Sequence, residues 1–353
     1  MQTRRIGQLH EDRMKPFAGL LVLLFLHAGL VAQQPDARTS QSQTPPPAPK
    51  QKPQPAKKKE PAKQLQRTRI DASMVGYIDP SAVQTEVRVR FDAGFNAPRP
   101  DRAEYFYAGC NGAIPCIGGI QRTLNFQQLY INAEYAPLKH FSVFVEVPFR
   151  WVQPFFIPNT GPPTLTSGGG ISDVQAGLKL AAIASAARNL TFQLGAHFPT
   201  ENGTNGLGTN HYTIEPKVLF FQKLSDRTAI EAEAGDSHPI GGTIYYATPS
   251  SPPQNYAADV AMYGVGPSYQ LISRDNYRVT PVFELVSWHV FGGLQAGSNS
   301  VVQSAAGINV LNAKLGARAS FSHGSSIYAG YGRSLTSDVW YKNLFRVEYR
   351  RVF

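Results

Sequence analysis

The sequence lacks the residue patterns on which most catalytic and metal sites depend. Ser237 stands beside His238 in the stretch GDSH, but neighbours in sequence do not form a nucleophile and its base, and no third partner can be placed. The histidines show no spacing typical of metal ligands, and the glycines of GVGPSY at 264–269 lack the strand–turn–helix context of a phosphate loop. We therefore predict no catalytic residue, no metal site and no cofactor.

Cysteine is almost absent. Cys110 and Cys116, in YAGCNGAIPC, are the only two cysteines among 353 residues. In an exported chain, a disulfide that closes this small loop is favoured over a metal site or two free thiols. The bridge would stiffen the loop, and a loop that gates or contacts a ligand is the alternative interpretation.

Net charge is also scarce outside the amino-terminal tail. Residues 33–69 carry nine Lys or Arg against Asp36 and Glu60, and residues 1–32 carry four basic and two acidic groups, which leaves only +1 of the total +10 for residues 70–353. A nucleic-acid partner is therefore excluded for the folded part. The basic tail fits a polyanionic surface, such as lipid head groups or a cell-wall polymer, or else it is a solvated spacer.

One long apolar run, FAGLLVLLFLHAGLVA at 17–32, lies near the amino terminus. It is shorter than the roughly 20 residues of a spanning helix and ends in small residues, so residues 1–32 are predicted to be a signal peptide, with Met1 or Met14 as the start. A permanent anchor is the alternative. Residues 33–83, rich in Pro, Gln and Lys near their start, are predicted to form a disordered basic linker in the periplasm.

From residue 84 onward, apolar and polar residues alternate over segments of about ten residues, which is the length of a tilted membrane strand. No helical periodicity of comparable length competes. The predicted strands are 84–95, 123–136, 140–151, 172–183, 190–200, 212–222, 228–236, 256–270, 277–290, 306–321, 326–335 and 343–353.

The connections between these strands alternate in length. Those after even strands are short, such as 137–139 and 223–227, whereas those after odd strands are mostly long, such as 96–122 and 152–171. This asymmetry is typical of outer-membrane barrels, whose short turns are periplasmic. Residues 84–353 are therefore predicted to form an all-β, transmembrane antiparallel β-barrel of about 12 strands, and outer-membrane lipid is an expected partner. Both the linker and the carboxy terminus would lie in the periplasm.

The stretch FSVFVEVPFRW at 141–151 shows which face meets lipid. Every second residue is apolar, and the residues between include Glu146 and Arg150. An Arg facing lipid at the midplane costs about 2–4 kcal/mol, so strand charges are expected inside. Ten basic and eleven acidic side chains would then face inward. Because the two signs nearly balance, we expect these charges to form ion pairs with one another, and we do not expect a pore with strong selectivity for anions or cations. The best pore-lining candidates are Arg88, Arg90, Glu146, Glu284 and Arg318.

The chain ends on FRVEYRRVF. The terminal Phe353 resembles the carboxy-terminal assembly signal of bacterial outer-membrane barrels, which implies the barrel-insertion machinery as a partner. The first and last strands must pair to close a barrel, and both bring mixed charges to that seam.

Four stretches carry a family resemblance: VEVPFRW, SGGGISDVQAGLKLA, LTFQLGAHFPTENG and IEPKVLFFQKL. They resemble the outer-membrane family named for the meta-cleavage pathway of phenol degradation, over roughly residues 100–353. The chain departs from the family pattern at Glu201 and Asn202, which precede Gly203. The resemblance implies passage of aromatic or other hydrophobic small molecules. The matching positions are Pro148, Gly170, Asp173, Gly177, Lys179, Pro199 and Thr200.

Two functions of different classes follow. The first is a passive channel for small, aromatic or hydrophobic solutes, and the second is a closed structural barrel that tethers the envelope through its basic tail. A lipid-active barrel enzyme is a third alternative, for which the histidines supply candidates without a motif. An aromatic girdle, and less surely a hydrophobic entry site, is expected from Tyr105, Phe106, Tyr107, Trp151, Phe155, Phe156, Tyr245, Tyr246, Trp340 and Tyr341.

Overall fold

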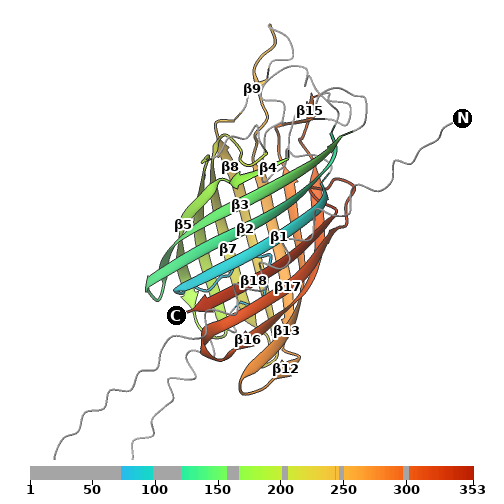
Figure 1. The fold of residues 1–353 in the computed structure, drawn as a ribbon. Helices are drawn as coiled ribbons and strands as arrows, with labels where there is room; N and C mark the ends of the chain where they lie inside the picture. The colour runs from blue at the N-terminus through green and yellow to red at the C-terminus, as the bar shows by residue number, and fades with distance from the viewer. Residues whose placement is uncertain are drawn as a thin grey trace, which may run out of the picture. The chain divides into compact units, whose positions relative to one another are not determined.

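The computed structural model describes residues 73–97, 121–156, 167–200, 206–242, 244–245, 250–296 and 302–353. In this part of the chain, twelve long strands form one closed antiparallel barrel, as the sequence predicts (Figure 1). They are β1 (Glu86–Ala97), β2 (Gln121–Leu138), β3 (Phe141–Phe156), β5 (Val174–Ala184), β6 (Arg188–Phe198), β7 (Tyr212–Lys223), β8 (Thr228–Ile240), β11 (Val260–Tyr269), β13 (Tyr277–Val290), β16 (Asn309–Phe321), β17 (Ser325–Ser334) and β18 (Asn343–Val352).

Short elements complete the fold. The strand β4 (Gly168–Ile171) pairs with β3, and β12 (Ile272–Ser273) pairs with β13. Two small ribbons join β9 (Ile244–Tyr245) to β10 (Gln254–Asn255) and β14 (Leu294–Ala296) to β15 (Val302–Ser304). A single turn of 3-10 helix, η2 (Ser322–Gly324), links β16 to β17. None of the helices among the described residues has the length and apolar character needed to cross a membrane.

The long strands follow one another around the barrel in chain order, with β11 between β8 and β13. The pairing of the first strand, β1, with the last, β18, closes the ring. At the β1–β18 seam Arg90 lies opposite Glu348 and Asp92 opposite Arg346. The mixed charges expected at this seam are therefore present and face one another.

The two ends of the barrel differ. Short connections such as 139–140, 185–187 and 322–324 lie at one end, which we call the short-turn end, and the longer connections lie at the other, the long-loop end (Figure 1). Glu86 at the start of β1 pairs with Val352 at the end of β18, so the barrel begins and finishes at the short-turn end.

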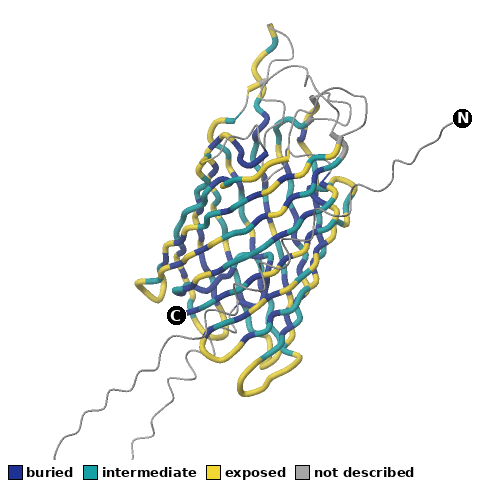
Figure 2. Tube along the Cα trace, viewed as in Figure 1, coloured by how far each residue is buried: buried dark blue, intermediate teal, exposed yellow. Residues whose placement is uncertain are grey.

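Side chains alternate between the inner and outer faces as predicted. On β3, Val145 is 40% exposed and Trp151 44% exposed, whereas Ser142 is fully buried and Arg150 is 1% exposed. Figure 2 shows the same alternation of buried and exposed positions around the wall. The apolar face of 141–151 is therefore the outer face, and the polar face points into the lumen.

The structure differs from the predicted disordered linker at residues 73–83. This segment, SMVGYIDPSAV, lies inside the barrel, and Met74, Val75 and Ile78 are buried there. Its composition explains the difference, because it carries apolar side chains that the Pro- and Lys-rich part upstream lacks. We call residues 73–85 the plug. The predicted signal peptide, the rest of the linker, and Cys110 with Cys116 lie outside the described residues.

Candidate functional site: the barrel lumen

Strand carboxylates hold the backbone N–H groups of the plug. Met74 N and Val75 N donate to Glu231 Oε1 at 2.7 and 3.3 Å. Glu284 accepts three bonds, from the N–H groups of residues 76, 77 and 78, at 2.9, 2.9 and 3.0 Å. The N–H of Asp79 donates to Glu233 Oε2 at 2.9 Å. Six consecutive backbone donors thus find charged acceptors, which offsets the cost of removing them from water.

Basic side chains hold the plug's carbonyl groups in the same way. Arg318 donates to the carbonyls of Met74 and Val75 at 3.1 and 2.7 Å, and Arg346 donates to that of Gly76 at 2.6 Å. Further along, the carbonyls of Pro80 and Ser81 accept from Lys179 at 3.1 Å and Thr191 at 2.6 Å. The wall therefore binds both the N–H and the C=O groups of a backbone that bends at residues 76–78.

One plug side chain, Tyr77, is held by cations. Lys314 Nζ and Arg346 Cζ lie over its ring, 3.8 and 4.1 Å from the centroid, and the ring packs edge-on against Tyr328 at 6.2 Å. Such contacts contribute about 0.5–2 kcal/mol each, more when desolvated.

The Tyr328 ring fits a slot lined by glycines. A Cβ atom placed on Gly76 of the plug, or on Gly316 or Gly330 of the wall, would collide with this ring. Tyr328 is fully buried, and its hydroxyl donates to Glu284 Oε1 at 3.2 Å. The plug can dock only where residue 76 has no side chain.

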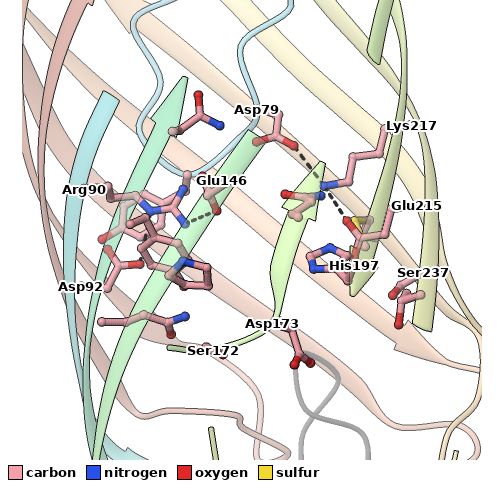
Figure 3. A pocket seen from close by; sticks show the side chains of 18 of the residues that line it. Asp79, Arg90, Asp92, Glu146, Ser172, Asp173, His197, Glu215, Lys217 and Ser237 are labelled. Carbon is pink, nitrogen blue, oxygen red and sulfur yellow. Dashed lines mark hydrogen bonds and ion pairs between the residues drawn. The ribbon is translucent and has the colours of Figure 1, made fainter. Parts of the chain in front are cut away.

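A cavity of about 240 Å³ lies against the plug within the lumen, and two charged clusters line it (Figure 3). On the β1–β3 wall, Arg90 pairs with Glu146 at 3.4 Å and with Asp92 at 3.7 Å. On the opposite side of the view, Lys217 pairs with Asp79 of the plug at 3.0 Å and with Glu215 at 3.3 Å. The charges face the cavity as pairs, so the surface is polar without a strong excess of either sign.

Hydrogen-bonded loop residues line the cavity toward the long-loop end. Asp173 Oδ2 accepts from both the backbone N–H and the hydroxyl of Thr209, at 2.7 and 2.6 Å. Ser172 donates its hydroxyl to the carbonyl of Leu207. His211 Nδ1 lies 2.9 Å from the carbonyl of Thr209, and burial lowers the pKa of its imidazole below the ordinary value. These contacts fix the 206–211 loop against the start of β5.

An apolar cluster of inward-facing side chains packs at the long-loop end. Trp340 packs against Trp288 with ring centroids 4.6 Å apart and ring planes tilted by 53°. The Tyr341 hydroxyl accepts a hydrogen bond from Lys314 at 3.0 Å. The prediction that Trp340 and Tyr341 belong to an outer girdle is therefore wrong, since they are 6% and 3% exposed and face the lumen. The connection 335–342 is short enough to fold inward over the barrel mouth.

Other members of the expected girdle have different outcomes. Trp151 and Phe155 are exposed on the outer face of β3, as a girdle requires. The remaining girdle candidates, or their side chains, lie outside the described residues.

The five predicted pore-lining residues all face inward but divide into two groups. Arg88, Arg90 and Glu146 line the cavity. Glu284 and Arg318 are fully buried against the plug instead. The sequence offered no signal for this division, because the plug residues that Glu284 contacts precede it by more than 200 positions.

Sequence reasoning missed the plug's other partners as binding residues. Glu231, Glu233 and Arg346 were expected only as inward charges, and Asp79 was assigned to the linker. The alternation of residues within the strands places the side chains of Glu231, Glu233 and Arg346 on the inner face, but it does not show that the plug is their partner.

The pair Ser237 and His238 is split by the strand that carries it. Ser237 is buried and lines the cavity, whereas His238 is exposed on the other face of β8. His238 Nδ1 lies 2.6 Å from Asp259 Oδ1, and Asp236 completes a group whose ligand atoms lie within 4.8 Å of one another. The spacing argument missed this group because Asp259, which directly precedes β11, is 21 residues from His238 in the sequence. The His238–Asp259 hydrogen bond accounts for their approach without an ion.

The sequence matches no known family model and no curated protein. Several solved structures share the fold. An outer membrane channel from Pseudomonas putida F1 is 14% identical, with a TM-score of 0.52 over 78% of this chain and 100% of that one. The β-domain of the Bordetella autotransporter BrkA (13% identity, TM-score 0.45, 76% and 100% covered) and the KdgM porin (9%, 0.37, 76% and 99%) are more distant. The chain therefore has the fold of an outer-membrane β-barrel.

Proposed function

We propose that this chain is an outer-membrane channel for the passive passage of small solutes. The observation that carries the proposal is the cavity inside a closed barrel, lined by ionised and hydrogen-bonding side chains. A barrel that served only as a scaffold would gain more from filling this space with apolar side chains, since each buried ion costs several kcal/mol in desolvation. A polar cavity inside a barrel whose outer face meets lipid fits a path for solutes instead.

Amphipathic solutes, such as small aromatic compounds with a polar group, are the class that the lumen supports best. A solute from the long-loop end would meet the apolar cluster around Trp288 and Trp340 first, and then the polar cavity. Aromatic rings of Phe126 and Tyr130 also line that cavity. The resemblance to the phenol-degradation family implies the same solutes. The paired charges disfavour a strongly anionic or cationic permeant.

Envelope partners follow from the position of the chain ends. The described chain starts and ends at the short-turn end, which is the periplasmic end in barrels of this type. We propose that the signal peptide directs export, that Phe353 engages the insertion machinery, and that the basic linker contacts a cell-wall polymer. A fractionation and cross-linking experiment on cells tests the location and the linker contact together.

A closed structural barrel is the second candidate, and the plug favours it. Residues 73–85 cross the lumen and bond to both of its walls, so the path is interrupted on the short-turn side of the cavity. A channel function therefore requires that the plug move.

The test is single-channel current from the full chain in a planar bilayer, with and without simple aromatic acids. Steady ohmic steps that an aromatic solute reduces would support the channel. Arg90→Ala should change conductance because Arg90 lines the cavity, whereas Arg274→Ala, at an exposed turn, is the matched control. Silence from folded protein, even after the plug has been released as described below, would reject the channel and favour the structural barrel.

A further inference from the structure

The contacts between plug and wall recognise a backbone more than a sequence. The wall groups that hold residues 74–79 contact N–H and C=O groups, which every non-proline residue has. Polar recognition of side chains is concentrated at three positions. Gly76 must lack a Cβ because of Tyr328, and Tyr77 meets the cations of Lys314 and Arg346. The Asp79 carboxylate pairs with Lys217 at 3.0 Å.

Both ends of the plug lie at the short-turn end of the barrel. The carbonyl of Ser73 accepts from Arg350 at 3.3 Å, near the end of β18. At its other end, the carbonyl of Thr85 accepts from Phe353 N at 3.0 Å, immediately before β1 starts. Between these points the plug reaches inward to Tyr77 and returns. A segment that enters and leaves by the same end can withdraw without being threaded through the barrel.

We propose that the inner wall formed by Glu231, Glu233, Glu284, Arg318 and Arg346 is a binding site for a polypeptide segment whose backbone bends within the lumen, as it does at residues 76–78. Residues 74–79 of the same chain occupy it here, and their withdrawal toward the short-turn end opens the channel. This inference rests on the proposed channel function and adds to it a site, its occupant and the direction of release.

The wall can exist in the released state because its charges keep partners or meet water. Arg346 keeps Asp92, to which it donates two bonds at 2.7 and 2.6 Å, and Arg318 keeps Glu348 at 2.9 Å. The carboxylates of Glu231 and Glu284 would exchange backbone N–H groups for water in the opened lumen. Because both states satisfy the same polar groups, the plug is held by the difference between two sets of hydrogen bonds together with the burial of Met74, Val75 and Ile78.

Substitution at Gly76 tests the site in the full chain. Gly76→Ala places a methyl group on the Tyr328 ring, which Gly316 and Gly330 prevent from moving away, so the docked state should be disfavoured. We expect time-averaged conductance in a planar bilayer to rise about tenfold or more over the parent. Ser81→Ala is the matched control within the plug, since the Ser81 hydroxyl has no hydrogen-bond partner among the described residues.

A free peptide tests binding directly. The synthetic peptide SMVGYIDPSAVQT, which reproduces residues 73–85, should block the Gly76→Ala channel when it is added on the short-turn side. The same peptide with Ala in place of glycine should block about tenfold less well. Equal block by both peptides, or none by either, would overturn the binding site.

A reversible lock covers the case in which Gly76→Ala disturbs folding. A Cβ atom on Gly264 of β11 would lie 3.0 Å from Ile78 Cγ1, so Ile78→Cys with Gly264→Cys, in a Cys110→Ser, Cys116→Ser background, places two thiols within bonding range. We expect no opening while the bridge is oxidised and restored opening after reduction. Conductance that is unchanged by the bridge and by Gly76→Ala would overturn the plug as a gate while leaving the channel intact. Silence from every folded variant would instead reject the channel itself.

Discussion

Glu284→Gln is the substitution that most directly measures how firmly the plug is held. Glu284 Oε2 accepts from Tyr77 N and Ile78 N at 2.9 and 3.0 Å, and Oε1 accepts from Gly76 N and the Tyr328 hydroxyl at 2.9 and 3.2 Å. A glutamine can keep its acceptor oxygen toward Tyr77 N and Ile78 N, with its amide nitrogen toward Gly76 N and the Tyr328 hydroxyl. The hydroxyl can turn and accept from that nitrogen, but Gly76 N cannot, so the shape is conserved while one hydrogen bond to the plug is lost.

The magnitude follows from that bond. Hydrogen bonds to charged groups contribute about 1.5–3 kcal/mol each, so losing one should weaken plug docking by about 1.5–3 kcal/mol. Since each 1.4 kcal/mol is a factor of ten, the ratio of released to docked plug should rise about 10- to 10²-fold. The uncharged side chain also removes the attraction that strengthens the remaining contacts.

Thiol labelling reports this ratio. Ser81→Cys, in a Cys110→Ser, Cys116→Ser background, places a thiol on a buried plug residue whose hydroxyl makes no hydrogen bond among the described residues. Its rate of reaction with a maleimide should rise with the released fraction until it reaches the rate of a free thiol. A threefold change in labelling rate corresponds to less than about 1 kcal/mol. If the Glu284→Gln variant is labelled within about threefold of the rate of the parent, the claim that this carboxylate holds the plug is refuted.

Three further substitutions test the barrel around the plug. Val145→Arg, in the middle of β3 on the outer face, should destabilise the barrel by about 2–4 kcal/mol in urea unfolding from lipid vesicles. Leu138→Arg, at the end of the neighbouring strand β2, should cost about 0–1 kcal/mol. Arg346→Met leaves Asp92 buried at the seam without its bidentate partner and should cost about 3–5 kcal/mol, which Asp92→Asn should partly restore in the double variant. Gly330→Ala should cost about 1–3 kcal/mol because its methyl group meets the Tyr328 hydroxyl, and it should cost less in a Tyr328→Phe background. Equal costs in the two backgrounds would contradict the claim that glycines line a slot for the Tyr328 ring.

The strands could be predicted from the sequence because period-two alternation is a direct consequence of a wall with lipid on one side and polar groups on the other. The segment 277–290 matches β13 at both ends. The boundaries that differ have local causes. Residues 256–259 continue the alternation into β11, yet Tyr256 and Ala257 are buried at the long-loop end before the strand starts at Val260.

The site was less predictable because its key partner comes from outside the alternating region. Inward charges are recognisable strand by strand, and Arg88, Arg90 and Glu146 do line the cavity, although their role in a pore stays a prediction. The plug has no period of its own, since its backbone bonds go to side chains instead of a neighbouring strand. Its only sequence signal is the change from a Pro- and Lys-rich tail to SMVGYIDPSAV, and composition alone does not say where such a segment binds.

The charge balance of the wall explains how such a plug can be both well bonded and releasable. Asp79 is the only charged residue in the plug, and its partner Lys217 also pairs with Glu215 at 3.3 Å. Withdrawal therefore leaves no cation without a carboxylate at this site, and the other wall groups exchange a neutral backbone for water. If the plug supplied the counter-charges for a cluster of like-charged wall residues, its release would leave those charges to repel one another and would cost far more free energy. The docked and released states therefore differ in hydrogen bonding and in the burial of Met74, Val75 and Ile78, and a bound solute or a pull on the linker could shift the balance between them.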